Sequence, residues 1–152
     1  MSFDGSLRII LAMGVQVCWD DDAHTILHYK MDGRWRWNEL YNAVIQGHAL
    51  NSDTSHDVYA VVNLEHGLGV PPSAMTQFGT LATLTRPNTK VVVFVGGGGF
   101  VSALIKTFNR IYHGTGVQSC WVATLADAYA LIAREQARSS RNEQIPYNKT
   151  AS

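Results

Sequence analysis

The sequence lacks a net charge, since 12 Lys and Arg residues balance 12 Asp and Glu residues. This balance gives no overall positive field of the kind expected of a general nucleic-acid binder. The chain also lacks an apolar run approaching the roughly 20 residues of a membrane-spanning helix. Near the start, the apolar segment LRIILAMGV contains an Arg and no small-residue cleavage site, so we expect no signal peptide. We therefore expect a cytoplasmic protein that binds no nucleic acid and has no stable membrane insertion.

Cysteine is scarce as well, with Cys18 and Cys120 the two examples in the chain. Both lie in segments predicted as strands, which favours buried, reduced thiols over a disulfide framework. Histidine is more frequent, and His24 and His28 stand four residues apart. On a strand this spacing separates the two residues by roughly 13 Å, too far for both to bind one metal ion. We therefore expect no metal site and no cofactor.

The best-defined stretch of the chain is a strand, a glycine turn and a helix. The β-branched and aromatic residues 91–95 predict a buried strand, and four glycines follow directly. An apolar-periodic segment from Phe100 to Ile111 then predicts a helix that packs back over the sheet. The 152 residues suit one compact domain with a sizeable core. Together these features indicate an α/β fold with a largely parallel sheet.

The remaining elements follow from hydrophobic periodicity and turn residues. Two strands form an antiparallel hairpin around the turn DDDA, and the nearly all-apolar segment VYAVVNL is typical of a central strand. The predicted strands are 8–19, 25–31, 58–64, 91–95 and 117–123, and the predicted helices are 37–49, 73–84, 100–111 and about 125–137. The order β-β-α-β-α-β-α-β-α describes a single domain whose mixed, mostly parallel sheet is flanked by helices. We expect an extension or extra strand at 1–14, the domain at 15–137 and a disordered polar tail at 138–152.

Over residues 15–137 this order resembles the STAS domain, the fold of bacterial anti-sigma-factor antagonists, and is most similar to its SpoIIAA-like branch. The branch shares its architecture with CRAL-TRIO lipid-binding domains. The segments that carry the resemblance are TILHYKMDGRWRW, VVNL, VVVFVGGGGFVSAL and WVATLADAYALI. They are mainly patterns of hydrophobicity, so they specify the fold more than the activity. The resemblance implies a module that acts through protein contacts, as a homodimer or with a regulatory protein partner.

The resemblance also implies a phosphorylated Ser or Thr where the second helix begins. The matching segment is Pro71-Pro72-Ser73-Ala74, in which only Ser73 has the right residue type, while the acidic neighbour and the following glycine of the family pattern are missing. A phosphate at a helix N-terminus is electrostatically tolerated, so Ser73 is a candidate phosphoacceptor. Ser73 is equally typical of an ordinary helix cap. The corresponding interaction surface extends from His66 to Thr76.

The glycine turn is a candidate ligand site of a different class. Gly96, Gly97, Gly98 and Gly99 leave the backbone open at the start of a helix, where free N–H groups bind anions. Glu65 and His66 follow a neighbouring parallel strand and should lie at the same edge of the sheet. An anion, a nucleotide or a lipid head group would suit this turn. Neither the dinucleotide fingerprint nor the P-loop pattern fits, and a turn that needs positive φ angles explains the glycines as well.

Other polar and aromatic residues give weaker signals. Trp35 and Trp37 alternate with two arginines, so we expect one tryptophan to anchor the first helix, while the other, if exposed, would indicate a protein contact. Ser102 lacks the glycine-flanked pattern of a nucleophile elbow. His66 and Glu65 follow the central strand at its carboxyl end, where an enzyme could use His66, but two polar residues in a loop are more often solvated. We therefore expect no catalytic residue and no enzyme. The sequence favours a non-enzymatic interaction module, with a ligand-binding domain at the glycine turn as the alternative.

Overall fold

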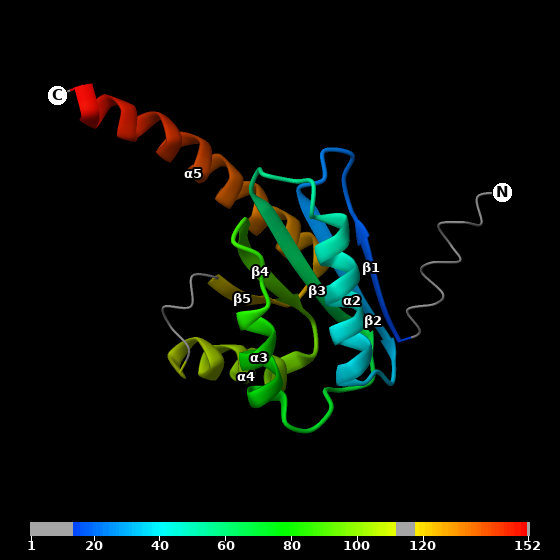
Figure 1. Ribbon diagram of the computed structural model, residues 1–152. Helices are drawn as coiled ribbons and strands as arrows, with labels where there is room; N and C mark the ends of the chain where they lie inside the picture. The colour runs from blue at the N-terminus through cyan, green and yellow to red at the C-terminus, as the bar shows by residue number, and fades with distance from the viewer. Residues whose placement is uncertain (1–13, 112–117, 152) are drawn as a thin grey trace.

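The computed structural model describes residues 14–111 and 118–151, with side chains through residue 141 (Figure 1). The elements, in chain order, are β1 (Val15–Trp19), β2 (Ile26–Gly33), α2 (Trp37–Leu50), β3 (Val58–Gly67), α3 (Ala74–Thr83), β4 (Thr89–Val95), α4 (Gly98–Ile111), β5 (Gln118–Val122) and α5 (Leu125–Ala151). This order confirms the predicted β-β-α-β-α-β-α-β-α architecture. No helix of the described ranges is long and apolar enough to cross a membrane.

The five strands form one sheet in the order β1-β2-β3-β4-β5. β1 pairs with β2 antiparallel, and each later strand adds in parallel to the one before it. The Asp21 carboxylate fixes the hairpin turn, because it accepts hydrogen bonds from the backbone N–H groups of Thr25 (2.9 Å) and Ile26 (3.0 Å). The sheet is therefore mixed, with one antiparallel edge strand.

Helices cover both faces of the sheet (Figure 1). On one face, Leu27, Ala60 and Phe94 pack with residues of α2, α3 and α4 in a large apolar core. On the other face, a smaller cluster joins β3 and β4 to Ala128 and Ile132 of α5. β3 is thus buried on both sides, as its apolar sequence predicted.

Three boundaries or environments differ from the sequence-based expectation. α5 continues to Ala151 instead of ending near residue 137, while the expected division of the chain at residue 138 stays a prediction. The predicted strand 8–19 is observed as β1, and its residues before 14 lie outside the described part of the chain. Cys18 is exposed instead of buried, because it lies on edge strand β1 and faces away from the core that holds Val15 and Val17. Cys120 is half-buried on the opposite edge strand, about 19 Å away at the usual strand spacing, so the two thiols cannot pair.

Candidate functional site at the carboxyl edge of the sheet

The carboxyl edge, defined as the ends of β3 and β4 with residues 65–73 and 96–100, brings two predicted segments together. Asn63 and Val95 are register partners on these parallel strands, so the residues after them emerge side by side. A Cβ atom placed on Gly96 would lie 3.0 Å from Cγ and 3.2 Å from Cα of Glu65. The glycine turn and Glu65 therefore touch, as the parallel order predicted. Whether they hold a ligand stays a prediction.

The glycines have specific structural roles in this turn. Gly96, Gly97 and Gly98 have φ angles of 81°, 80° and 72°, a left-handed conformation that favours glycine. The Gly96 carbonyl accepts a 2.8 Å hydrogen bond from Nε1 of Trp121. A Cβ atom on Gly97 would lie 2.3 Å from Cγ2 of Val101, whereas nothing lies within 4 Å of one on Gly98 or Gly99. Backbone geometry thus explains the first three glycines, while the space around Gly98 and Gly99 leaves the start of α4 open.

Glu65 and His66 lie on an extension of β3 instead of in the predicted loop. Strand pairing continues to Gly67, after a register shift between Lys30 and Asp32 of β2. The buried Asn63 stabilises β3 beside this register shift, because its Oδ1 accepts a 3.0 Å hydrogen bond from the backbone N–H of Glu65. Both Glu65 and His66 are exposed. The Glu65 carboxylate places a negative charge against the glycine turn, which opposes the binding of an anion there.

Two tryptophans hold the loop that leads from β3 to α3. Nε1 of the buried Trp35 donates to the Gly69 carbonyl at 3.0 Å, and Nε1 of Trp37 donates to the Pro72 carbonyl at 2.8 Å. The two indoles contact each other edge to face, with ring centroids 4.9 Å apart. Trp35 is an anchor in the core, as expected of one tryptophan. Trp37 is half-buried against Phe78, so it lacks the exposure that would have indicated a protein contact.

Ser73 precedes α3 but does not cap it through its side chain. Its backbone is left-handed, with φ 70° and ψ 28°, and the hydroxyl makes no capping hydrogen bond. Only the Ser73 carbonyl takes part in the helix, accepting from the backbone N–H of Gln77 at 3.0 Å. Ser73 is exposed, as is Thr76 in the first turn of α3. The interpretation of Ser73 as an ordinary side-chain cap is therefore wrong, because a left-handed residue does not aim its hydroxyl at the free N–H groups.

Exposed apolar side chains are the feature of this edge that the sequence analysis missed. Leu68 in the loop after β3 is 69% exposed, and Phe100 in the first turn of α4 is 65% exposed. The apolar periodicity had assigned Phe100 to the core side of its helix. In the structure the buried stripe of α4 is Val101, Ile105 and Phe108, and Phe100 lies outside it. The sequence showed the apolar spacing i, i+4 and i+7 of this stripe, but it did not show that the neighbouring Phe100 lies outside it.

Histidines elsewhere in the molecule make local structural contacts. His24 stacks on Trp19 with ring centroids 4.7 Å apart, and Nδ1 of His28 contacts the Asp20 carboxylate at 3.1 Å. Asp20 also accepts a 2.5 Å hydrogen bond from the hydroxyl of Tyr129, which ties α5 to the β1–β2 hairpin. Burial, together with this hydrogen bond, raises the pKa of the Tyr129 hydroxyl. Within the described ranges, no group of three or more His, Cys, Asp or Glu residues is arranged to hold a metal ion.

Comparison with known proteins identifies the fold. A solved structure of an uncharacterized DUF3478-family protein from Shewanella loihica PV-4, with a SpoIIAA-like fold, superposes with a TM-score of 0.59. The match covers 78% of this chain and 93% of that chain, at 13% sequence identity. No family model matches the sequence, and no curated protein does. The protein therefore has a SpoIIAA-like α/β fold, as the order of its elements had predicted.

Proposed function

We propose that this protein is a non-enzymatic regulatory module that acts through protein contacts at the carboxyl edge, with a second copy of the chain as its partner. The observation that carries the proposal is the exposure at this edge of Leu68, in the loop after β3, and Phe100, in the first turn of α4. Exposed apolar side chains that gather in one patch mark sites of protein interaction. The adjacent glycines have no side chains, so a partner can approach the backbone closely.

The rigidity of the carboxyl edge supports this role. The hydrogen bonds of Trp35 and Trp37 fasten the loop that carries Leu68, and Trp121 fastens the turn before Phe100. A surface held in one conformation loses little entropy on binding, which favours association. These contacts give the carboxyl edge a fixed shape without any need for a ligand.

Self-association of purified protein tests the proposal directly. We expect a concentration-dependent dimer in sedimentation equilibrium, and we expect Leu68→Asp or Phe100→Asp to weaken it by at least about tenfold. Burial of such a side chain contributes about 1.5–3 kcal/mol, and tenfold corresponds to about 1.4 kcal/mol. Ile45→Asp is the matched control, because Ile45 is 63% exposed but lies on α2. A wild-type monomer at all concentrations, or a dimer that both carboxyl-edge variants leave intact, would contradict the proposal.

Phosphorylation of Ser73 would regulate this surface. The side chain is exposed, and its hydroxyl is not engaged in helix capping. A phosphate adds about −1.5 to −2 charge at the rim of an apolar contact, where its desolvation disfavours association. We expect Ser73→Asp to weaken the dimer and Ser73→Ala to leave it unchanged. Equal dimer affinities for the two variants would remove Ser73 from the regulatory mechanism.

A second candidate function, ligand binding at the glycine turn, is favoured by the open space around Gly98 and Gly99. An anion could accept hydrogen bonds from N–H groups at the start of α4, although the Glu65 carboxylate opposes it. The two effects can be separated by titrating phosphate into ¹⁵N-labelled protein. If the turn binds anions, Glu65→Gln should strengthen phosphate binding and shift the amide signals of residues 97–101. Signals that stay unmoved in both proteins would exclude an anion site there.

A further inference from the structure

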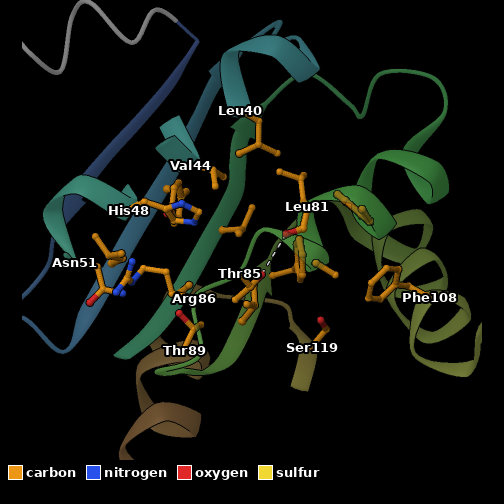
Figure 2. Close-up of a pocket in the computed structure, with 18 residues that line it drawn as sticks. Leu40, Val44, His48, Asn51, Leu81, Thr85, Arg86, Thr89, Phe108 and Ser119 are labelled. Atoms are coloured by element: carbon orange, nitrogen blue, oxygen red, sulfur yellow. Dashed lines mark hydrogen bonds between the residues drawn. The ribbon is translucent and has the colours of Figure 1, made fainter. Parts of the chain in front are cut away.

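A cavity of about 110 Å³ lies between the sheet and helices α2, α3 and α4, away from the carboxyl edge (Figure 2). Its lining is mostly apolar. Ala60 and Val62 line it from the sheet, Leu40 and Val44 from α2, and Leu81 from α3. Close packing normally leaves few interior voids larger than a water molecule. For comparison, an engineered apolar cavity of about 150 Å³ admits benzene. The cavity can therefore accept a small apolar group.

One end of the cavity is polar. His48, Asn51, Arg86 and Thr89 gather there, as Figure 2 shows. Asn51 follows α2 and Thr89 begins β4, so this end lies at the edge where the parallel strands start. The cavity is thus amphipathic, with an apolar body and a polar end. Its polar end lies at the opposite edge of the sheet from the glycine turn.

Arg86 is the group at this end that lacks a full set of partners. Its Nε atom is buried, and no hydrogen-bond partner for it is found among the described residues. Asn51, by contrast, exchanges two hydrogen bonds with the side chain of Asn88, at 3.2 and 3.0 Å. A guanidinium stays charged at all physiological pH values, and a buried donor without a partner is costly. The Nε–H group of Arg86 therefore needs a hydrogen-bond acceptor, and an anion suits the charged guanidinium best.

His48 adds no positive charge to the polar end of the cavity. Burial lowers the pKa of the His48 imidazole, and the nearby Arg86 charge lowers it further, against a hydrogen bond with the backbone of Leu84. His48 is therefore held neutral near pH 7 and can donate or accept a hydrogen bond without adding charge. Arg86 is left as the permanent positive charge facing the cavity.

We propose that this cavity binds a short aliphatic carboxylate, whose chain lies among Val44, Val62 and Leu81 and whose carboxylate pairs with the Arg86 guanidinium. The volume suits an alkyl chain of about four to five carbon atoms, since the larger cavity of about 150 Å³ admits the six carbons of benzene. The planar guanidinium offers Nε and a terminal nitrogen as a fork that matches the two oxygens of a carboxylate. Binding at this site is independent of contacts at the carboxyl edge.

Three ligands with the same five-carbon chain test the proposal. Pentanoate, 1-pentanol and pentylammonium are titrated into ¹⁵N-labelled full-length protein, and dissociation constants are taken from the amide shifts. We expect pentanoate to bind about tenfold or more tighter than 1-pentanol, as a hydrogen bond to a charged group would give. We expect pentylammonium to bind most weakly. Equal binding of pentanoate and 1-pentanol, or no binding of pentanoate, would overturn the proposal.

Variants assign the preference to Arg86. Arg86→Gln should abolish the advantage of pentanoate over 1-pentanol, whereas Arg110→Gln, at an exposed site on α4, should keep it. Arg86→Lys retains the charge without Nε and should give an intermediate preference, and it serves if the glutamine variant fails to fold. Ala82→Leu extends a lining side chain into the cavity and should weaken both ligands. A preference for pentanoate that survives Arg86→Gln would refute the assigned role.

Discussion

Replacement of Ser73 by glycine tests whether this residue is strained or serves as a helix cap. Ser73 has φ 70° and ψ 28°, and its side chain makes no capping hydrogen bond. A non-glycine residue in this conformation costs about 1–2 kcal/mol, which glycine avoids. The substitution therefore relieves backbone strain without removing a side-chain contact.

The expected gain follows from two opposing terms. Relief of about 1–2 kcal/mol is offset by about 0.5–1 kcal/mol, because glycine gives the unfolded chain more conformational freedom. The net increase in the free energy of unfolding is about 0–1.5 kcal/mol, which raises Tm by up to about 6 °C for a chain of this size. A serine that capped the helix would behave differently, since its replacement by alanine costs typically about 1 kcal/mol. Ser73→Ala should instead change stability by less than about 0.5 kcal/mol, since it removes no cap.

Urea unfolding at neutral pH, followed by tryptophan fluorescence, measures these differences. Gly69→Ala is the matched control, because Gly69 lies in the same loop with φ 82° and an added Cβ atom would meet nothing within 4 Å. It introduces the strain that Ser73→Gly removes, so it should lower the free energy of unfolding. A loss of about 1 kcal/mol or more in Ser73→Ala, or destabilisation by Ser73→Gly, would refute the reasoning and restore the capping role.

Two further perturbations examine the hairpin turn and the glycine turn. Burial raises the pKa of the Asp21 carboxyl, but hydrogen bonds from Thr25 and its neighbours outweigh this and lower it. The stabilisation is therefore present above the unfolded-state pKa of about 3.9 and is lost as the pH falls through the lowered folded-state pKa. Asp21→Asn should cost at most about 1 kcal/mol at pH 7, because solvent screens this partly exposed carboxylate, and in urea unfolding at successive pH values that deficit should shrink toward pH 3. A deficit that does not change with pH would contradict the assignment. Gly97→Ala combines a positive φ with a contact to Val101, so it should lower the free energy of unfolding by more than about 1 kcal/mol. Gly99→Ala places its methyl group in open space and should not lower it. Similar thermal unfolding of the two variants would count against this account of the turn.

The sequence alone determined the kinds and order of the elements. The run VYAVVNL required a strand buried on both faces, and β3 is covered by helices on both sides. The glycine run marked a turn with positive φ angles, which Gly96, Gly97 and Gly98 adopt. These features depend on residues close together in the chain, because periodicity and backbone preference are local properties. The boundaries were less accurate, since the end of α5 and the exposure of Phe100 do not follow from periodicity.

Only the tertiary structure decided which distant residues meet. The sequence did not settle the strand order, and the structure resolves it with every neighbouring pair consecutive in the chain. That order sets Glu65 against Gly96 and leaves Cys18 exposed on an edge strand. It also places Arg86 and His48, 38 positions apart in the chain, at one end of the same cavity. Such contacts depend on how strands and helices pack, and local sequence carries no record of that packing.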